Sequence, residues 1–149
     1  MVELVPTLLR QELARLAEDD LRLDGRGRWD GRDVDLEIDC LYNAEGSAKV
    51  VMGKTIVYAG VKFEIRTPWP DRPSQGSLMC GAELRPVAHR KYEPGPPSPQ
   101  SIELGRVVDR GIRESGCIDM ESLCIVPGEK VWGVMIDIHV LSDGGNVFD

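Results

Sequence analysis

The sequence has little of what several common classes of protein require. None of its 149 residues lies in an apolar run long enough to cross a bilayer. Its start is amphipathic, with Glu3 and Arg10, and does not follow the charged-then-apolar order of a secretory leader. We therefore expect a soluble protein of the cytoplasm with no membrane contact.

Close groups of metal-binding side chains are also scarce. The four cysteines (Cys40, Cys80, Cys117 and Cys124) are scattered without two-residue spacing, and there are 2 histidines. Because a zinc site needs close ligand pairs, we predict reduced thiols and no metal. No glycines fall at the spacing of a phosphate-binding loop and no serine sits in a nucleophile elbow, so we predict neither a nucleotide cofactor nor a serine hydrolase.

What is present is a hydrophobic share of 42%, enough for one domain with a core, and a formal net charge of -7. This charge opposes attraction to a phosphate backbone, so any contact with nucleic acid would need local basic patches. Most of the 18 basic residues are arginine. The planar guanidinium suits phosphate contacts and interface ion pairs better than the lysine ammonium does.

The N-terminal region predicts a helix followed by an arm. Residues 4–18 place Leu8, Leu9, Leu13 and Leu16 at helical spacing. Their apolar stripe packs on the same domain or docks a neighbouring subunit, and packing in the same chain is the simpler expectation. Residues 21–35 are crowded with glycine and arginine and predict an extended, turn-rich arm. We divide the chain into an N-terminal helix, 1–20, and a domain, 21–149.

Strand signals follow in quick succession. Apolar residues alternate with acidic ones from Val34 to Tyr42, which predicts a strand with one face in the core and an acidic face outside. Turns at 43–46 and 53–54 lead to two more strands in meander order. The proline-rich segment 67–77 predicts a loop. Alternation resumes at 78–84, and a last strand is predicted at 132–140.

A second helix is predicted between Ser98 and about Ser115, with Ser98 as N-cap, Pro99 at the first helical position and Gly116 as the stop. The expected buried stripe consists of apolar residues at helical spacing. They are Leu104, Val107, Val108 and Ile112.

Arg106, Arg110 and Arg113 fall together on the opposite side of this helix. They span about 10 Å at the helical rise, enough to follow successive phosphates of a single strand. The alternative is a solvated face on which Glu103, Asp109 and Glu114 form ion pairs with the arginines. Spacing alone leaves both interpretations open.

One further pair could carry chemistry. Asp137 and His139 lie two residues apart on one strand face, so they could touch and share a proton. A polar strand face packed against another element is the favoured interpretation, because a pair alone supplies neither a nucleophile nor a substrate pocket.

Four stretches of the sequence resemble the RNase PH family. They are LRLDGR from residue 21, NAEGSAKVVMGKTIVYAGVK at 43–62, EPGPPSPQSIELGRVVDRGIRES at 93–115 and DGGNVFD at 143–149. Within the family they are most similar to the archaeal exosome ring subunit that pairs with the catalytic one. The resemblance covers nearly everything from residue 21 onward.

The resemblance implies an α+β fold of the RNase PH type, like domain 2 of ribosomal protein S5. It would be a half-domain with a mixed or antiparallel sheet and a helix packed across it. The phosphate-binding loop and the acidic catalytic residue of active members would lie in a second half, beyond the residues matched here. Active relatives also carry paired arginines where this chain has Pro99 and Gln100. No catalytic residue is therefore expected.

The implied function is that of a non-catalytic subunit of the archaeal RNA exosome in 3′-to-5′ RNA degradation. Such a subunit forms a heterodimer with the catalytic RNase PH-like subunit, three heterodimers close a hexameric ring, and RNA-binding cap subunits join it. Arg106 and Arg110 match family positions expected to reach single-stranded RNA. For Arg113, only its helical spacing supports a contact with RNA.

Two alternatives remain at this point: a phosphorolytic exoribonuclease active by itself, and a stand-alone RNA-binding module. Whether the arginine arm at 22–32 touches RNA is also open. Because a half-domain exposes the apolar surface that its other half would cover, we expect this chain to oligomerise or to be poorly soluble.

Overall fold

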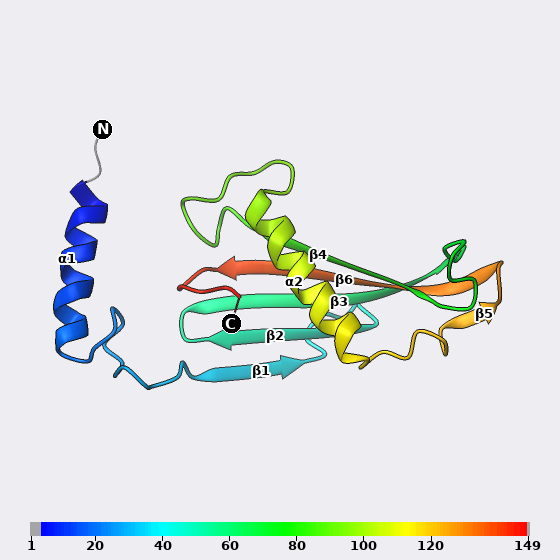
Figure 1. Cartoon of the computed structure of the whole chain (residues 1–149), viewed down its shortest axis with the longest axis horizontal. Coiled ribbons are helices and arrows are strands. Elements are labelled where there is room, and N and C mark those ends of the chain that lie inside the picture. The colour runs from blue at the N-terminus through cyan, green and yellow to red at the C-terminus, as the bar shows by residue number, and fades with distance from the viewer. Residues whose placement is uncertain (1–3, 149) are drawn as a thin grey trace. The chain divides into compact units, whose positions relative to one another are not determined.

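Two helices and six strands form along residues 4–148, the part of the chain that this computed structural model describes (Figure 1). In chain order they are α1 (Leu4–Glu18), β1 (Val34–Ile38), β2 (Gly46–Met52), β3 (Thr55–Arg66), β4 (Ser77–Leu84), α2 (Pro99–Ser115), β5 (Cys124–Val126) and β6 (Lys130–Ser142). The chain divides into two units, residues 1–32 and 33–149. Neither helix within residues 4–148 is both long and apolar enough to cross a membrane.

The first unit contains the predicted helix over residues 4–18, which is confirmed. The arm that follows is bonded to itself. The Arg22 guanidinium donates to the Arg28 carbonyl at 2.7 Å, and Arg26 bonds the Asp24 carboxylate at 2.8 Å and the Asp30 carbonyl at 2.8 Å. Two arm arginines are thus held inside the arm. The surface on which the α1 stripe packs, and the division at residue 20, stay predictions.

The second unit is one mixed sheet with α2 on it. The strand order is β1-β2-β3-β6-β4, and β5 pairs with β6. The first three strands form the predicted antiparallel meander, β3 and β6 are antiparallel, and β4 and β6 are parallel. The predicted α+β fold with a mixed sheet and a helix across it is confirmed.

The helix α2 crosses β4 closely because small residues lie at the contact (Figure 1). A Cβ on Gly105 would lie 3.3 Å from the Ala82 nitrogen. The buried Ser101 hydroxyl donates to the Ala82 carbonyl at 2.8 Å. Leu104 then reaches the core cluster, which Ala82, Ile138 and Val140 complete.

Two expectations about buried faces are wrong. Val107 was expected in the buried stripe of α2, but it is 52% exposed, because the contact face follows Ser101, Leu104 and Gly105, and Val107 points away from it. The apolar side chains of β1 were expected in the core, yet each is at least 60% exposed. The helix covers β4, and three strands separate β4 from β1.

One strand boundary and one whole strand also differ from expectation. The first strand ends at Ile38 and does not reach Tyr42, because Asp39 adopts a left-handed conformation with φ of 57° that breaks the alternation. The strand β5 was not predicted. With 3 residues it is too short to show a period.

Filling the close crossing is expected to destabilise the fold. We predict that Gly105→Val lowers the free energy of unfolding by about 1 to 3 kcal/mol, since its methyl groups would press on the β4 backbone. Gly111→Ala, in the same helix with nothing within 4 Å of the added carbon, is the matched control. It should stabilise by up to about 1 kcal/mol through helix propensity. Urea denaturation of both variants measures the difference, and equal effects would show that the crossing is not tight.

Candidate nucleic-acid interface on helix α2

The position of α2 is fixed by its ends. The Ser98 hydroxyl accepts a hydrogen bond from the Ser101 amide at 3.2 Å, and Pro99 follows at the first helical position. Gly116 ends the helix with φ of 64°, a left-handed conformation that glycine adopts without strain. The predicted start and stop are confirmed.

Two arginines project from the outer face of α2. Arg106 and Arg110 are exposed and lie one turn apart. Within residues 4–148 neither makes a hydrogen bond or an ion pair. Their guanidinium groups keep all their donors for a partner outside the chain, such as a phosphate.

Arg113 is bonded differently. Its guanidinium donates to both carboxylate oxygens of Asp109, at 3.1 and 2.8 Å, and to the Leu78 carbonyl of β4 at 3.1 Å. The hydrogen bond to Asp109 raises the pKa of Arg113. The side chain ties the last turn of α2 to the edge of the sheet. A role for Arg113 in RNA binding stays a prediction, and such a contact would compete with these bonds.

The alternative for this helix face, in which Glu103, Asp109 and Glu114 form ion pairs with the arginines, is realised only in part. Asp109 pairs with Arg113, while within the described residues Glu103 and Glu114 form no salt bridge. The face therefore holds two unpaired cations, Arg106 and Arg110, between carboxylates that do not neutralise them by contact.

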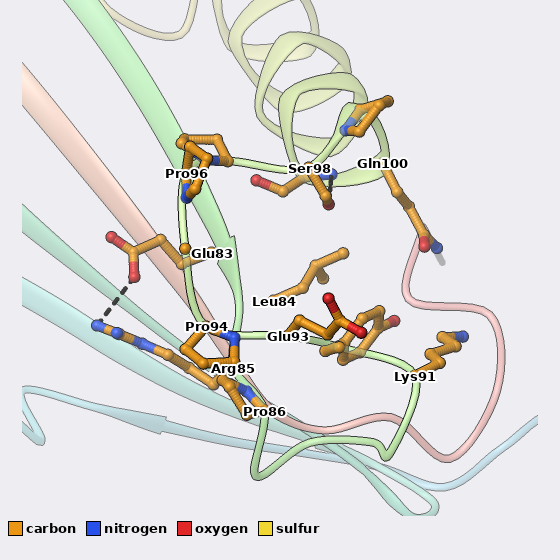
Figure 2. A pocket seen from close by; sticks show the side chains of 15 residues that line it. Glu83, Leu84, Arg85, Pro86, Lys91, Glu93, Pro94, Pro96, Ser98 and Gln100 are labelled. Atoms are coloured by element: carbon orange, nitrogen blue, oxygen red, sulfur yellow. Dashed lines mark hydrogen bonds and ion pairs between the residues drawn. The ribbon is translucent and has the colours of Figure 1, made fainter.

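An open groove of about 810 Å³ lies at the start of α2, between residues 83–86 and 91–101 (Figure 2). Figure 2 shows Gln100 and Lys91 on one side of it and Glu83 and Arg85 on the other. The Arg85 guanidinium pairs with the Glu83 carboxylate at 2.9 Å, and Lys91 pairs with Asp143 at 2.8 Å. Both cations that line the groove are thus engaged within the chain.

A buried carboxylate holds the wall of this groove. The Tyr92 hydroxyl donates to Asp143 at 2.6 Å, and the Gly145 amide donates to the other oxygen at 3.1 Å. The Asp143 side chain is only 6% exposed. Burial acts to raise its pKa, but the hydrogen bonds from Lys91, Tyr92 and the Gly145 amide outweigh burial and lower the pKa to about 2. Sequence reasoning missed this contact, because its partners lie about fifty residues apart and no local pattern links them.

The suggested contact between Asp137 and His139 does not form. His139 Nδ1 instead accepts from the Arg85 guanidinium at 3.3 Å and lies 3.8 Å from the Glu83 carboxylate. The side chains of Arg85, Glu83 and His139 thus form a polar cluster beside the groove. In residues 4–148 there is no group of three or more metal-binding side chains, and the four cysteines are free.

Comparison with known proteins defines the class of this domain. Residues 30–149 match the RNase PH family, described as the 3′ exoribonuclease family, domain 1. The chain belongs to this family.

Particular members of the family are close in sequence and in structure. The chain is 50% identical over 149 residues to the exosome complex component Rrp42 of Methanosarcina acetivorans, and covers 56% of that protein. A solved Archaeoglobus fulgidus exosome with RNA bound to the active site has a chain 46% identical, with a TM-score of 0.93 over 99% of this chain and 58% of that one. An archaeal exosome core gives 42% identity and a TM-score of 0.83, covering 96% and 53% of the two chains. The chain thus spans just over half the length of these relatives.

The low pKa of Asp143 makes stability depend on pH. Because the folded pKa lies below the unfolded one, this carboxylate stabilises the fold above about pH 4, and the contribution is lost as the pH falls toward 2. We predict that Asp143→Asn costs about 1 to 2 kcal/mol at pH 7, a figure reduced for the half-exposed Lys91. The cost should shrink below pH 4. Denaturation of both proteins across this range measures it, and a cost independent of pH would contradict the assignment.

Arg113 and Arg106 should differ in their effect on stability. We expect Arg113→Ala to lower the free energy of unfolding by about 1 kcal/mol, because the Leu78 carbonyl and Asp109 lose their donor. Arg106→Ala, in the same helix and without bonds to lose, should stay within about 0.5 kcal/mol of the parent. Thermal denaturation compares the two, and an equal loss would mean that Arg113 does not hold the helix to β4.

Proposed function

We propose that this chain works as a non-catalytic ring subunit of an archaeal RNA exosome and helps to bind RNA during 3′-to-5′ degradation. The observation that carries this proposal is the pair of unpaired arginines on α2, in a chain 50% identical to an archaeal exosome component. The partners would be a catalytic RNase PH-like subunit in a heterodimer, two further heterodimers that close the ring, and RNA-binding cap subunits. The cytoplasmic location and the domain boundary at residue 20 are part of the same proposal.

The groove at the start of α2 supports a role without catalysis. Pro99 and Gln100, which stand there in the first turn, carry no charge that could neutralise a phosphate. The cations of the groove, Arg85 and Lys91, are neutralised by Glu83 and Asp143. This groove is therefore a poor place to stabilise the charge of phosphate chemistry, which depends on positioned cations.

The outer face of α2 supports RNA binding. Arg106 and Arg110 are one helical turn apart and can each donate two parallel hydrogen bonds to phosphate oxygens. The net charge of -7 works against long-range attraction. Binding should therefore be weak in the isolated chain and strengthen when a partner supplies further contacts to the same strand.

Replacing both arginines should weaken RNA binding and its dependence on salt. We predict that Arg106→Ala with Arg110→Ala reduces the slope of log affinity against log salt by about 1.4 for a single-stranded oligoadenylate, since each lost phosphate contact removes about 0.7. The control is Arg72→Ala with Arg90→Ala, which removes the same charge from exposed sites outside α2. Fluorescence anisotropy gives the slopes. Equal slopes for the two double variants would refute a direct contact.

The absence of catalysis is tested by an assay with and without partner. Phosphate-dependent shortening of poly(A) should occur only when a catalytic RNase PH-like subunit is added to the chain. Robust shortening by the purified chain alone would favour the self-sufficient exoribonuclease. Tight RNA binding that a catalytic partner neither strengthens nor turns into degradation would favour the stand-alone RNA-binding module.

A further inference from the structure

The two edge strands of the sheet differ in what covers them. At one edge, β4 carries α2, and two of its carbonyls accept hydrogen bonds from α2 side chains, Ala82 from Ser101 and Leu78 from Arg113. At the other edge, β1 pairs among residues 4–148 with β2 alone. All its residues are exposed, and Val34, Leu36 and Ile38 are 60%, 60% and 69% exposed.

Of the features that keep edge strands from pairing, β1 lacks proline, lysine and a bulge, and its only charges are the carboxylates of Asp35 and Glu37. Natural edges are blunted by proline, lysine, a bulge or very short length. The sequence of β1, VDLEI, contains neither proline nor lysine, and its register with β2 runs from Val34 opposite Met52 to Ile38 opposite Ala48 without a shift. No bulge interrupts its pairing over residues 34–38, and among residues 4–148 no strand pairs with its outer edge.

The two faces of β1 define what could pair with it. One face carries the exposed apolar side chains. The other carries Asp35 and Glu37, and Asp33 directly precedes the strand. Lys49 of β2 lies 3.1 Å from Glu37, so a lysine on a neighbouring strand already satisfies part of this acidic row from the inner side. A lysine or arginine on an added strand would do the same from the outer side.

A second copy of this chain is a poor occupant. If β1 paired with β1 so that the apolar faces matched, carboxylates would stand directly opposite carboxylates, and like charges in that position are destabilising. Nucleic acid is excluded by the same acidic row. The complementary partner is a polypeptide strand with apolar residues on one face and basic residues on the other.

We propose that β1 is a docking edge, to which an extended segment of a partner protein adds as a further strand, with basic side chains alternating with apolar ones. This inference rests on the proposed function only in placing the chain within an assembly of proteins, and it needs no contact with RNA. Main-chain hydrogen bonds supply affinity and the acidic row supplies specificity, as in other cases of strand addition.

The test uses two short capped peptides on the full chain, one alternating lysine with valine and one alternating glutamate with valine. The lysine peptide should bind about tenfold more tightly by fluorescence anisotropy, and Asp35→Lys with Glu37→Lys should reverse the preference. The control, Glu18→Lys with Glu129→Lys, makes the same change of charge at exposed sites off the strand and should leave the preference unchanged. Equal binding of both peptides, or equal effects of the two double variants, would overturn the proposal.

Hydrogen exchange gives a second measurement that needs no variant. The lysine peptide should slow deuterium uptake in residues 34–38 and leave residues 77–84 unchanged. Uptake that is unchanged in both segments would also overturn the proposal. The Arg106 and Arg110 variant should lose RNA binding relative to its own parent with or without the Asp35 and Glu37 changes, so a failure here is distinct from a failure of the RNA-binding role.

Discussion

The close crossing of α2 over β4 sets the position of nearly every candidate functional residue in the domain. Gly105 and Ser101 let the helix backbone approach the strand, and Leu104 fills the core beneath it. A helix held this closely has a defined outer face, and that face carries Arg106 and Arg110. The same crossing covers one edge of the sheet and leaves β1, at the far edge, exposed.

The cations on and beside α2 fall into two groups with different physical roles. Arg85, Lys91 and Arg113 are each bonded to a carboxylate within the domain, where they hold the groove wall and the end of α2. Such pairs contribute mainly through geometry, because partly exposed ion pairs are worth little in free energy. Arg106 and Arg110 make no comparable bond among residues 4–148. Contact with a phosphate outside the chain would then cost no internal ion pair.

Local patterns in the sequence predicted most of the helices and strands, but they did not predict the contacts between elements that are far apart in the chain. The ends of α2 could be predicted because Ser98, Pro99 and Gly116 act on their own neighbourhood. The burial of Gly105 in place of Val107 could not be predicted from the sequence. Amphipathic periodicity marks large apolar residues as buried, whereas a close crossing of helix and strand favours small ones. The exposure of β1 was missed because alternation shows that a strand has an apolar face without showing what covers it.

The candidate site was predicted in the same uneven way. Helical spacing predicted three arginines on one face of α2; Arg106 and Arg110 are exposed there, and their contact with RNA stays a prediction. The bond between Arg113 and the Leu78 carbonyl depends on how the helix meets β4, and residues 35 positions apart in the sequence give no sign of it. Four strings carried the family resemblance, the two longest at α2 and the β2–β3 hairpin, and the match over residues 30–149 confirms it.

The most direct test is a structure of this chain assembled with a catalytic RNase PH-like subunit and a single-stranded RNA. We expect phosphate oxygens within hydrogen-bonding distance of the Arg106 and Arg110 guanidinium groups, while Arg113 remains bonded to Asp109. RNA that passes elsewhere, with the outer face of α2 covered by protein or left in solvent, would contradict the RNA-binding role.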